Sequence, residues 1–131
     1  MTHKVNDREY ESVRHLPVEG RYEHLIKRAA DWSELWSLQS AEGWVVGADE
    51  SGREFIPVWP HPRYAEASAT GAWKGATPAP IEIHEWLETW TPELVTSARL
   101  IGVFPVDDGP SAVIDPQAFA ADLEGELSLV E

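Results

Sequence analysis

Residues 35–58 of the chain read LWSLQSAEGWVVGADESGREFIPV, and this stretch decides the predicted fold. It contains three β-prone runs, Leu35–Ser40, Gly43–Asp49 and Arg53–Val58, joined by two short links of glycine and small polar residues. Links this short force neighbouring strands to pair in an antiparallel sense, so the stretch predicts a three-stranded meander. Pro57 lacks an N–H group, which places it at a strand end or a sheet edge.

The residues before the meander predict one clear helix. Apolar side chains recur at helical spacing between Tyr22 and Trp32, with charged residues between them. This pattern indicates an amphipathic helix over about Pro17–Asp31. Residues 1–16 show no clear period, and we expect a loosely docked arm or a short helix there.

The residues after the meander alternate between helices and short strands. His61-Pro62 opens a helix with proline at its first position, and Gly71 ends it. A loop over Ala72–Pro80 and a short strand over Pro80–Ile83 follow. Helical spacing returns from Trp86 to Leu94, where the Thr91-Pro92-Glu93 sequence predicts a kink or two consecutive helices.

The last third of the chain predicts a hairpin and a final helix. Leu100–Phe104 is continuously apolar, as in a central strand covered on both faces. The Asp107–Pro110 turn leads back through a second strand, Ala112–Ile114. Asp115-Pro116 then caps a helix that carries Phe119, Leu123 and Leu127 inward.

These elements together predict one α+β domain over residues 17–131, preceded by the 1–16 arm. We expect a mainly antiparallel sheet of five or six strands with about four packed helices, since there is little β-α-β alternation. The 131 residues are enough to form a core without crosslinks, and the chain has no cysteine.

The charge balance restricts the classes of partner. The chain holds 10 Lys and Arg against 23 Asp and Glu, a formal net charge of −13. Such a surface repels phosphate backbones and anionic lipid, so we expect no nucleic-acid partner and no membrane partner. The residues from Met1 to Glu19 contain no apolar core of a signal peptide, and no apolar run is long enough to span a bilayer. We therefore expect a cytoplasmic protein.

Two sets of residues are candidates for binding. The acidic pairs Asp49/Glu50 and Asp107/Asp108 lie in predicted turns, where they either keep the protein soluble or attract a cationic partner. The second set is aromatic, because the chain has seven tryptophans. Trp44, Trp86 and Trp90 follow strand or helix periods and are expected in the core. The remaining candidates line a cleft, anchor a protein interface or cover the neighbouring helix as a structural lid; they are Trp59, His61, Tyr64 and Trp73.

Catalytic patterns are missing from the sequence. It has no nucleophile elbow and no phosphate-binding glycine loop. The run from His84 to Glu88 begins like a zinc-protease motif but has glutamate where the second histidine is required. His24, His61 and His84 could meet with an acidic residue, yet a cap or a solvated face explains each of them equally well. We expect no enzyme activity, no metal and no cofactor.

Several motifs together resemble a known family. They are Phe55–His61 with Tyr64-Ala65, Trp86–Pro92 and Val103-Phe104-Pro105. They resemble a family of small bacterial proteins catalogued as domain of unknown function 2750, over about residues 18–127. The resemblance implies a cytoplasmic α+β protein without established activity, in which Trp59, Pro60, His61 and Tyr64 fall on the shared motif.

The order of elements is also similar to the N-terminal domain of the enhanced-serine-sensitivity protein B family. That domain resembles several immunity proteins of bacterial toxin systems in its general plan. This second likeness rests on fold order alone and is an analogy.

These observations support a small acidic binding protein with a basic protein partner, specifically an immunity-type neutraliser of a cationic toxin or nuclease domain. A nuclease has a basic cleft, which an acidic partner can find at electrostatically steered rates and block. The alternative is a small-ligand or peptide-binding domain with its aromatic cleft around Trp59 and Tyr64. A third hypothesis is an enzyme in which carboxylates or histidines converge.

Overall fold

The strands form two sheets that meet at one point. The computed structural model describes residues 4–106 and 112–130. The first sheet has the order β2-β1-β5, and the second has the order β3-β4-β6-β7. The strands are β1 (Glu34–Ser40), β2 (Gly43–Trp44), β3 (Gly47–Ala48), β4 (Glu54–Val58), β5 (Thr77–Glu82), β6 (Leu100–Val103) and β7 (Ala112–Ile114). All neighbours pair antiparallel except β4 and β6, so the predicted α+β class is confirmed.

The predicted meander is wrong in one respect. The run Gly43–Asp49 is not one strand, because it is divided at Val45 and Val46. Its first half, β2, pairs with β1, while its second half, β3, pairs with β4 in the other sheet. The sheets join where Trp36 and Trp59 exchange two backbone hydrogen bonds, of 2.9 and 2.8 Å. The chain therefore passes from one sheet to the other within the predicted strand.

Strand β5 is longer than the sequence predicted. It starts at Thr77, inside the expected loop, and pairs with β1 over its whole length. Pro78 and Pro80 fit because β5 is the edge of its sheet, where proline removes no hydrogen bond of a central ladder.

Strand β6 is central, as predicted, but it ends at Val103 rather than at Phe104. Phe104 is fully buried and has a left-handed backbone with φ of 40°, which is rare for a bulky residue. This conformation turns the chain out of the strand. The Phe104 carbonyl accepts a hydrogen bond of 3.1 Å from Arg21 Nε on the second helix.

Four helices form at predicted places, although the third ends at Ala67, before the predicted stop at Gly71. They are α1 (Asp7–Arg14), α2 (Val18–Trp32), α3 (Pro62–Ala67) and α6 (Pro116–Val130). His61 Nδ1 accepts from the Arg63 N–H at 3.1 Å, and an Asp115 carboxylate oxygen accepts from the Gln117 N–H at 2.9 Å. The arm forms α1 and packs onto α3, since Tyr10 stacks on Tyr64 with ring centroids 5.3 Å apart.

One further helix runs from Ile83 to Thr96 without a break. It consists of α4 (Ile83–Glu85), a π-helical turn η2 (Trp86–Trp90) and α5 (Thr91–Thr96). The π-turn lies directly before the Thr91-Pro92 pair, where the sequence predicted a kink or two consecutive helices. There the N–H of Thr91 bonds to the Trp86 carbonyl, and Thr91 Oγ1 donates to the same oxygen at 3.0 Å. A π-turn widens the helix by one residue directly before the proline.

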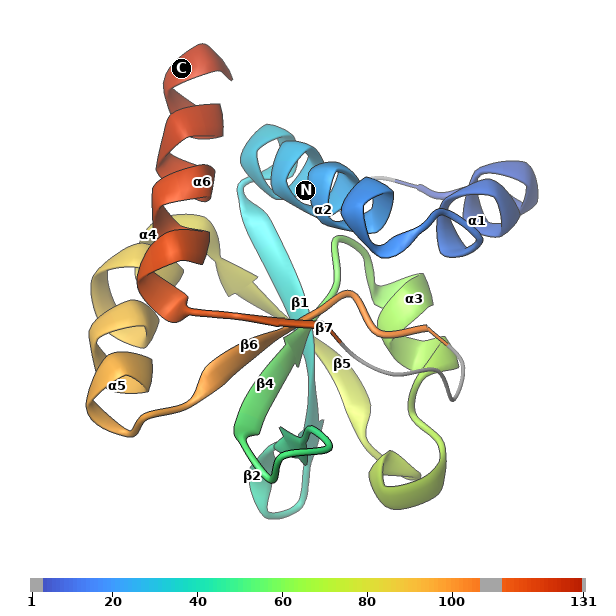
Figure 1. Cartoon of the computed structure of the whole chain (residues 1–131). Helices are drawn as coiled ribbons and strands as arrows, with labels where there is room; N and C mark the ends of the chain where they lie inside the picture. The colour runs from blue at the N-terminus through green and yellow to red at the C-terminus, as the bar shows by residue number, and fades with distance from the viewer. Residues whose placement is uncertain (1–3, 107–111, 131) are drawn as a thin grey trace.

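Figure 1 shows the strands between two groups of helices. The helix of residues 83–96 and α6 lie on one side, and α1 and α3 lie on the other. The core between them contains large side chains with less than 2% exposure, including Trp59, Trp86, Phe104, Phe119 and Leu25. One continuous core across both sheets makes the chain a single α+β domain.

Candidate functional site

Of the four predicted aromatic residues, three are buried, whereas Trp73 borders a pocket of about 340 Å³. Trp59 is 0% exposed, and its indole N–H donates to the Pro105 carbonyl at 2.8 Å. Tyr64 is 2% exposed, and burial raises its pKa above the usual value. His61 is 9% exposed and caps α3. Trp73 is half-buried, with its ring at right angles to that of Trp59 at 6.2 Å. Packing in the core therefore explains Trp59, His61 and Tyr64, whereas Trp73 is also reached from its pocket.

Of the predicted acidic residues, the structure describes Asp49 and Glu50, which lie in one turn. Asp49 closes the β3–β4 turn, where its carboxylate accepts from the Ser51 and Arg53 N–H groups at 3.0 and 2.9 Å. The backbone hydrogen bond from Arg53, reinforced by the Arg53 side chain, holds the pKa of Asp49 below its usual value. Glu50 is exposed in the same turn. Asp107 and Asp108 lie outside the described residues.

The histidines that could have met at a metal lie apart. His61 caps α3, His84 Nδ1 lies 2.8 Å from Glu82 Oε2, and His24 on α2 packs against Phe104 with centroids 6.5 Å apart. Burial, with the nearby Arg28 charge, lowers the pKa of His24. Among residues 4–106 and 112–130, no group of three His, Asp or Glu side chains gathers closely enough to hold a metal ion.

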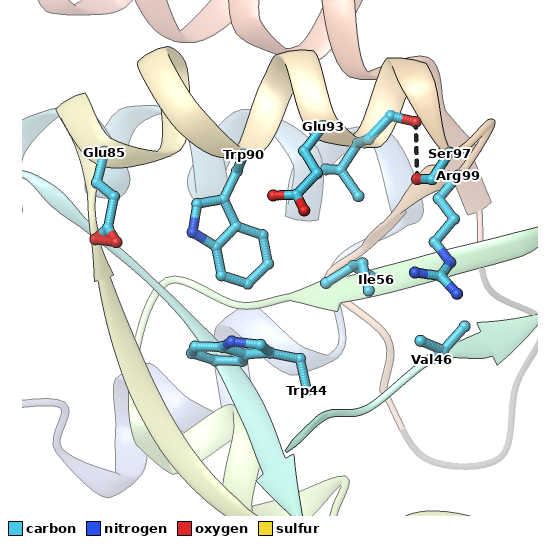
Figure 2. Close-up of a pocket in the computed structure, with 9 residues that line it drawn as sticks. Trp44, Val46, Ile56, Glu85, Trp90, Glu93, Ser97 and Arg99 are labelled. Carbon is cyan, nitrogen blue, oxygen red and sulfur yellow. Dashed lines mark hydrogen bonds between the residues drawn. The ribbon is translucent and has the colours of Figure 1, made fainter. Parts of the chain in front are cut away.

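A different pair of tryptophans borders a pocket of about 480 Å³. The pocket lies between the helix of residues 83–96 and the link from β2 to β3 (Figure 2). Trp90 points from the helix toward Trp44, and the two rings meet edge-to-face at 4.9 Å and 79°. Ile56 and Val46 add apolar surface beside them. We call this cavity the Trp44–Trp90 pocket.

Two buried aromatic residues support Trp90 on the side away from the pocket. Trp90 stacks on Trp86 at 5.2 Å and 17°, and Trp86 meets Phe119 of α6 at 5.8 Å and 80°. Trp86 and Phe119 are both 0% exposed. Because a fully packed indole is fixed in one orientation, the position of the Trp90 ring is fixed as well.

Charged groups surround the tryptophans. Glu85 and Glu93 extend from the helix on either side of Trp90 (Figure 2), and both are exposed. Within the described parts of the chain, neither carboxylate takes part in a hydrogen bond or an ion pair. Arg99 lies at the other end of the pocket, where its Nε is 3.3 Å from Glu54 Oε1. The pocket therefore combines two unpaired negative charges with one positive charge that already has a partner.

Sequence reasoning missed this site because it assigned Trp44 and Trp90 to the core. Both are half-buried, and only Trp86 of the three periodic tryptophans is fully buried. The sequence held one usable signal, which is the Thr91-Pro92 pair inside a helical pattern. It marks the irregular turn that carries Trp90, and such turns occur often at functional sites.

Comparisons with known proteins agree with the resemblance in the sequence. No curated protein and no solved structure matches the chain significantly. The helices in the described parts are all too short or too polar to cross a membrane. The likeness to the enhanced-serine-sensitivity protein B domain stays a prediction. A family model described as "Protein of unknown function (DUF2750)" matches residues 22–123, and the chain therefore belongs to this family.

Proposed function

We propose that the protein binds a basic protein partner through the acidic helix pair formed by the helix of residues 83–96 and α6. These two helices pack together and contain no lysine or arginine. Among the residues that the structure describes, their acidic side chains without an ion pair or hydrogen bond are those of Glu85, Glu88, Glu93, Glu124 and Glu126. This uncompensated charge on two adjoining helices is the observation that carries the proposal, because such a surface steers a cationic partner into contact.

The arginines elsewhere do little to offset that charge. Five of them form ion pairs with neighbouring acids; these are Arg14, Arg28, Arg53, Arg63 and Arg99. Arg21 donates instead to two backbone carbonyls. The formal net charge of −13 already counts every lysine and arginine, so a negative field surrounds the molecule whether or not these cations are paired.

More specifically, we propose that the protein is an immunity-type neutraliser of a cationic toxin or nuclease domain. A rigid acidic protein can cover a basic cleft and replace the phosphate charges that the cleft normally binds. We do not extend the proposal to a cleft around Trp59 and Tyr64, because both rings are buried.

Affinity capture from cells that make the protein tests the proposal. Three baits are compared: the wild type, the helix-pair variant Glu88→Gln/Glu124→Gln, and the control variant Glu19→Gln/Glu66→Gln, whose exposed residues lie on α2 and α3. Both variants change the net charge equally. We expect the wild type and the control to retain one protein rich in lysine and arginine, and the helix-pair variant to retain less of it.

The captured protein is then purified and titrated at about 50 mM and about 300 mM NaCl. Affinity should fall at least about tenfold over this range, because salt screens exposed charges. Capture of no specific protein, or of a neutral protein with salt-independent affinity, contradicts the proposal.

A further inference from the structure

We infer that the Trp44–Trp90 pocket binds an arginine side chain of the basic partner. This inference rests on the proposed function, since it names the group that the acidic helix pair recognises. It adds a defined binding site to a charge argument that by itself places the partner only somewhere on the two helices.

The aromatic wall supplies the first half of the recognition. A guanidinium group is attracted to the face of an indole, and tryptophan is the strongest of the aromatic residues in this respect. Trp44 and Trp90 each present part of a half-buried ring to the pocket. The stacking of Trp90 on the buried Trp86 fixes this wall before a ligand arrives, which lowers the entropy cost of binding.

The carboxylates supply the second half. Glu85 and Glu93 lie on opposite sides of the Trp90 ring, as Figure 2 shows. A planar guanidinium can lie on an indole and still donate hydrogen bonds at its edge to a carboxylate. Lysine offers a compact ammonium group without this planar geometry, and so the arrangement favours arginine.

The floor of the pocket fits the rest of an arginine side chain. Val46, Ile56 and Leu94 are apolar and partly or fully buried. They can cover the methylene groups that precede the guanidinium. The volume of about 480 Å³ is larger than a single side chain needs, so a neighbouring partner residue can enter with it.

Arg99 does not turn the pocket into an anion site. Its guanidinium lies 3.3 Å from Glu54, which offsets its charge. The groups around the pocket, Glu85, Glu93, Glu54 and Arg99, together carry an excess of negative charge. A carboxylate ligand would meet two unpaired glutamates and is therefore disfavoured.

The direct test uses a defined probe, the peptide acetyl-Gly-Arg-Gly-amide. It is titrated into ¹⁵N-labelled protein, and the indole N–H resonances are followed by NMR. We expect the Trp44 and Trp90 signals to move with a dissociation constant of about 1 mM, as suits one weakly held side chain. The matched peptide contains citrulline, which keeps the shape and loses the charge, and it should leave both signals in place. A lysine peptide should bind more weakly than the arginine peptide.

Two variants separate the pocket from general charge. The pocket variant Glu85→Gln/Glu93→Gln should bind the arginine peptide about tenfold more weakly. The control variant Glu19→Gln/Glu66→Gln changes the net charge equally, away from both the pocket and the helix pair, and should bind it like the wild type. Circular dichroism checks that both remain folded, and all four substituted positions are exposed.

The outcomes also distinguish this inference from the proposed function. If the whole partner binds with strong salt dependence while the arginine peptide leaves the Trp44 and Trp90 signals unmoved, the pocket inference is wrong and the basic-partner proposal stands. Equal shifts with arginine and citrulline, or equal weakening by both variants, also overturn the inference. If the peptide binds but no basic protein does, the proposed function fails alone.

Discussion

Substitution of Gly102 by alanine tests the packing of the second sheet. Phe55 lies on β4, between Gly47 of β3 and Gly102 of β6, and is 4% exposed. A Cβ atom built at Gly102 would lie 2.6 Å from Phe55 Cε1, and one built at Gly47 would lie 2.5 Å from Phe55 Cζ. The phenyl ring thus fills the space that side chains at both glycines would need.

The structure sets the sign and size of the expected effect. Alanine normally stabilises a protein by about 0.4–1 kcal/mol when it replaces a glycine in compatible backbone, because it restricts the unfolded chain. At Gly102 the added carbon must displace a buried aromatic ring between strands, and such overpacking costs about 1–3 kcal/mol. We expect Gly102→Ala to lower the free energy of unfolding by about 1–2 kcal/mol after the two effects are combined.

Gly125→Ala is the matched control, since Gly125 lies inside α6 with no atom within 4 Å of a built Cβ. It should raise the free energy of unfolding by about 0.8–1 kcal/mol. Urea unfolding followed by circular dichroism measures both changes. In a Phe55→Leu background, Gly102→Ala should lower the free energy of unfolding by less, because the smaller leucine side chain can move away from the added carbon. Two results would refute the packing argument. One is a Gly102→Ala protein whose free energy of unfolding equals that of the wild type. The other is a Gly102→Ala effect on this free energy that is equally large in the Phe55→Leu background.

Three further predictions concern polar groups. Ser37→Ala should cost about 1–3 kcal/mol in urea unfolding, because Ser37 Oγ donates at 2.6 Å to the buried Pro57 carbonyl, which would lose its partner. Tyr22→Phe should cost about 1 kcal/mol by the same assay, because it removes the hydrogen bond from the Tyr22 hydroxyl to Asp122 that joins α2 to α6; an unchanged midpoint would show the bond contributes nothing. Burial lowers the pKa of His24 below the ordinary histidine value of about 6.5, so the unfolded chain takes up the proton first. The free energy of unfolding should therefore fall as the pH drops below about 6.5, and less so in His24→Leu; equal pH slopes would contradict this cause.

The parts of the fold that sequence reasoning predicted are those with local signals. The cap at Asp115, the proline after His61 and the apolar run before Phe104 each act within a few residues. The division of Gly43–Asp49 between two sheets has no such signal, because Val45 and Val46 suit either sheet. The parallel pairing of β4 with β6 joins segments about 45 residues apart and depends on the whole core.

The candidate site was harder to predict for the same reason. Trp59 can be buried at no loss of hydrogen bonding because its indole N–H donates to the Pro105 carbonyl, 46 residues further along the chain. Trp44 and Trp90 follow the periods of inward-facing residues, but they lie at the rim of the core, where two elements leave a gap. Periodicity identifies the buried side of an element and does not reveal where neighbouring elements fail to cover it.

The central claim is that the acidic helix pair recognises a basic protein. Its most direct measurement is the dissociation constant of the captured partner across a salt series, for the wild type and for the charge-reversed variant Glu88→Lys/Glu124→Lys. We predict that reversal weakens binding strongly at low salt and that the difference narrows as salt screens the charges. Equal affinities for the two proteins at every salt concentration would contradict the claim.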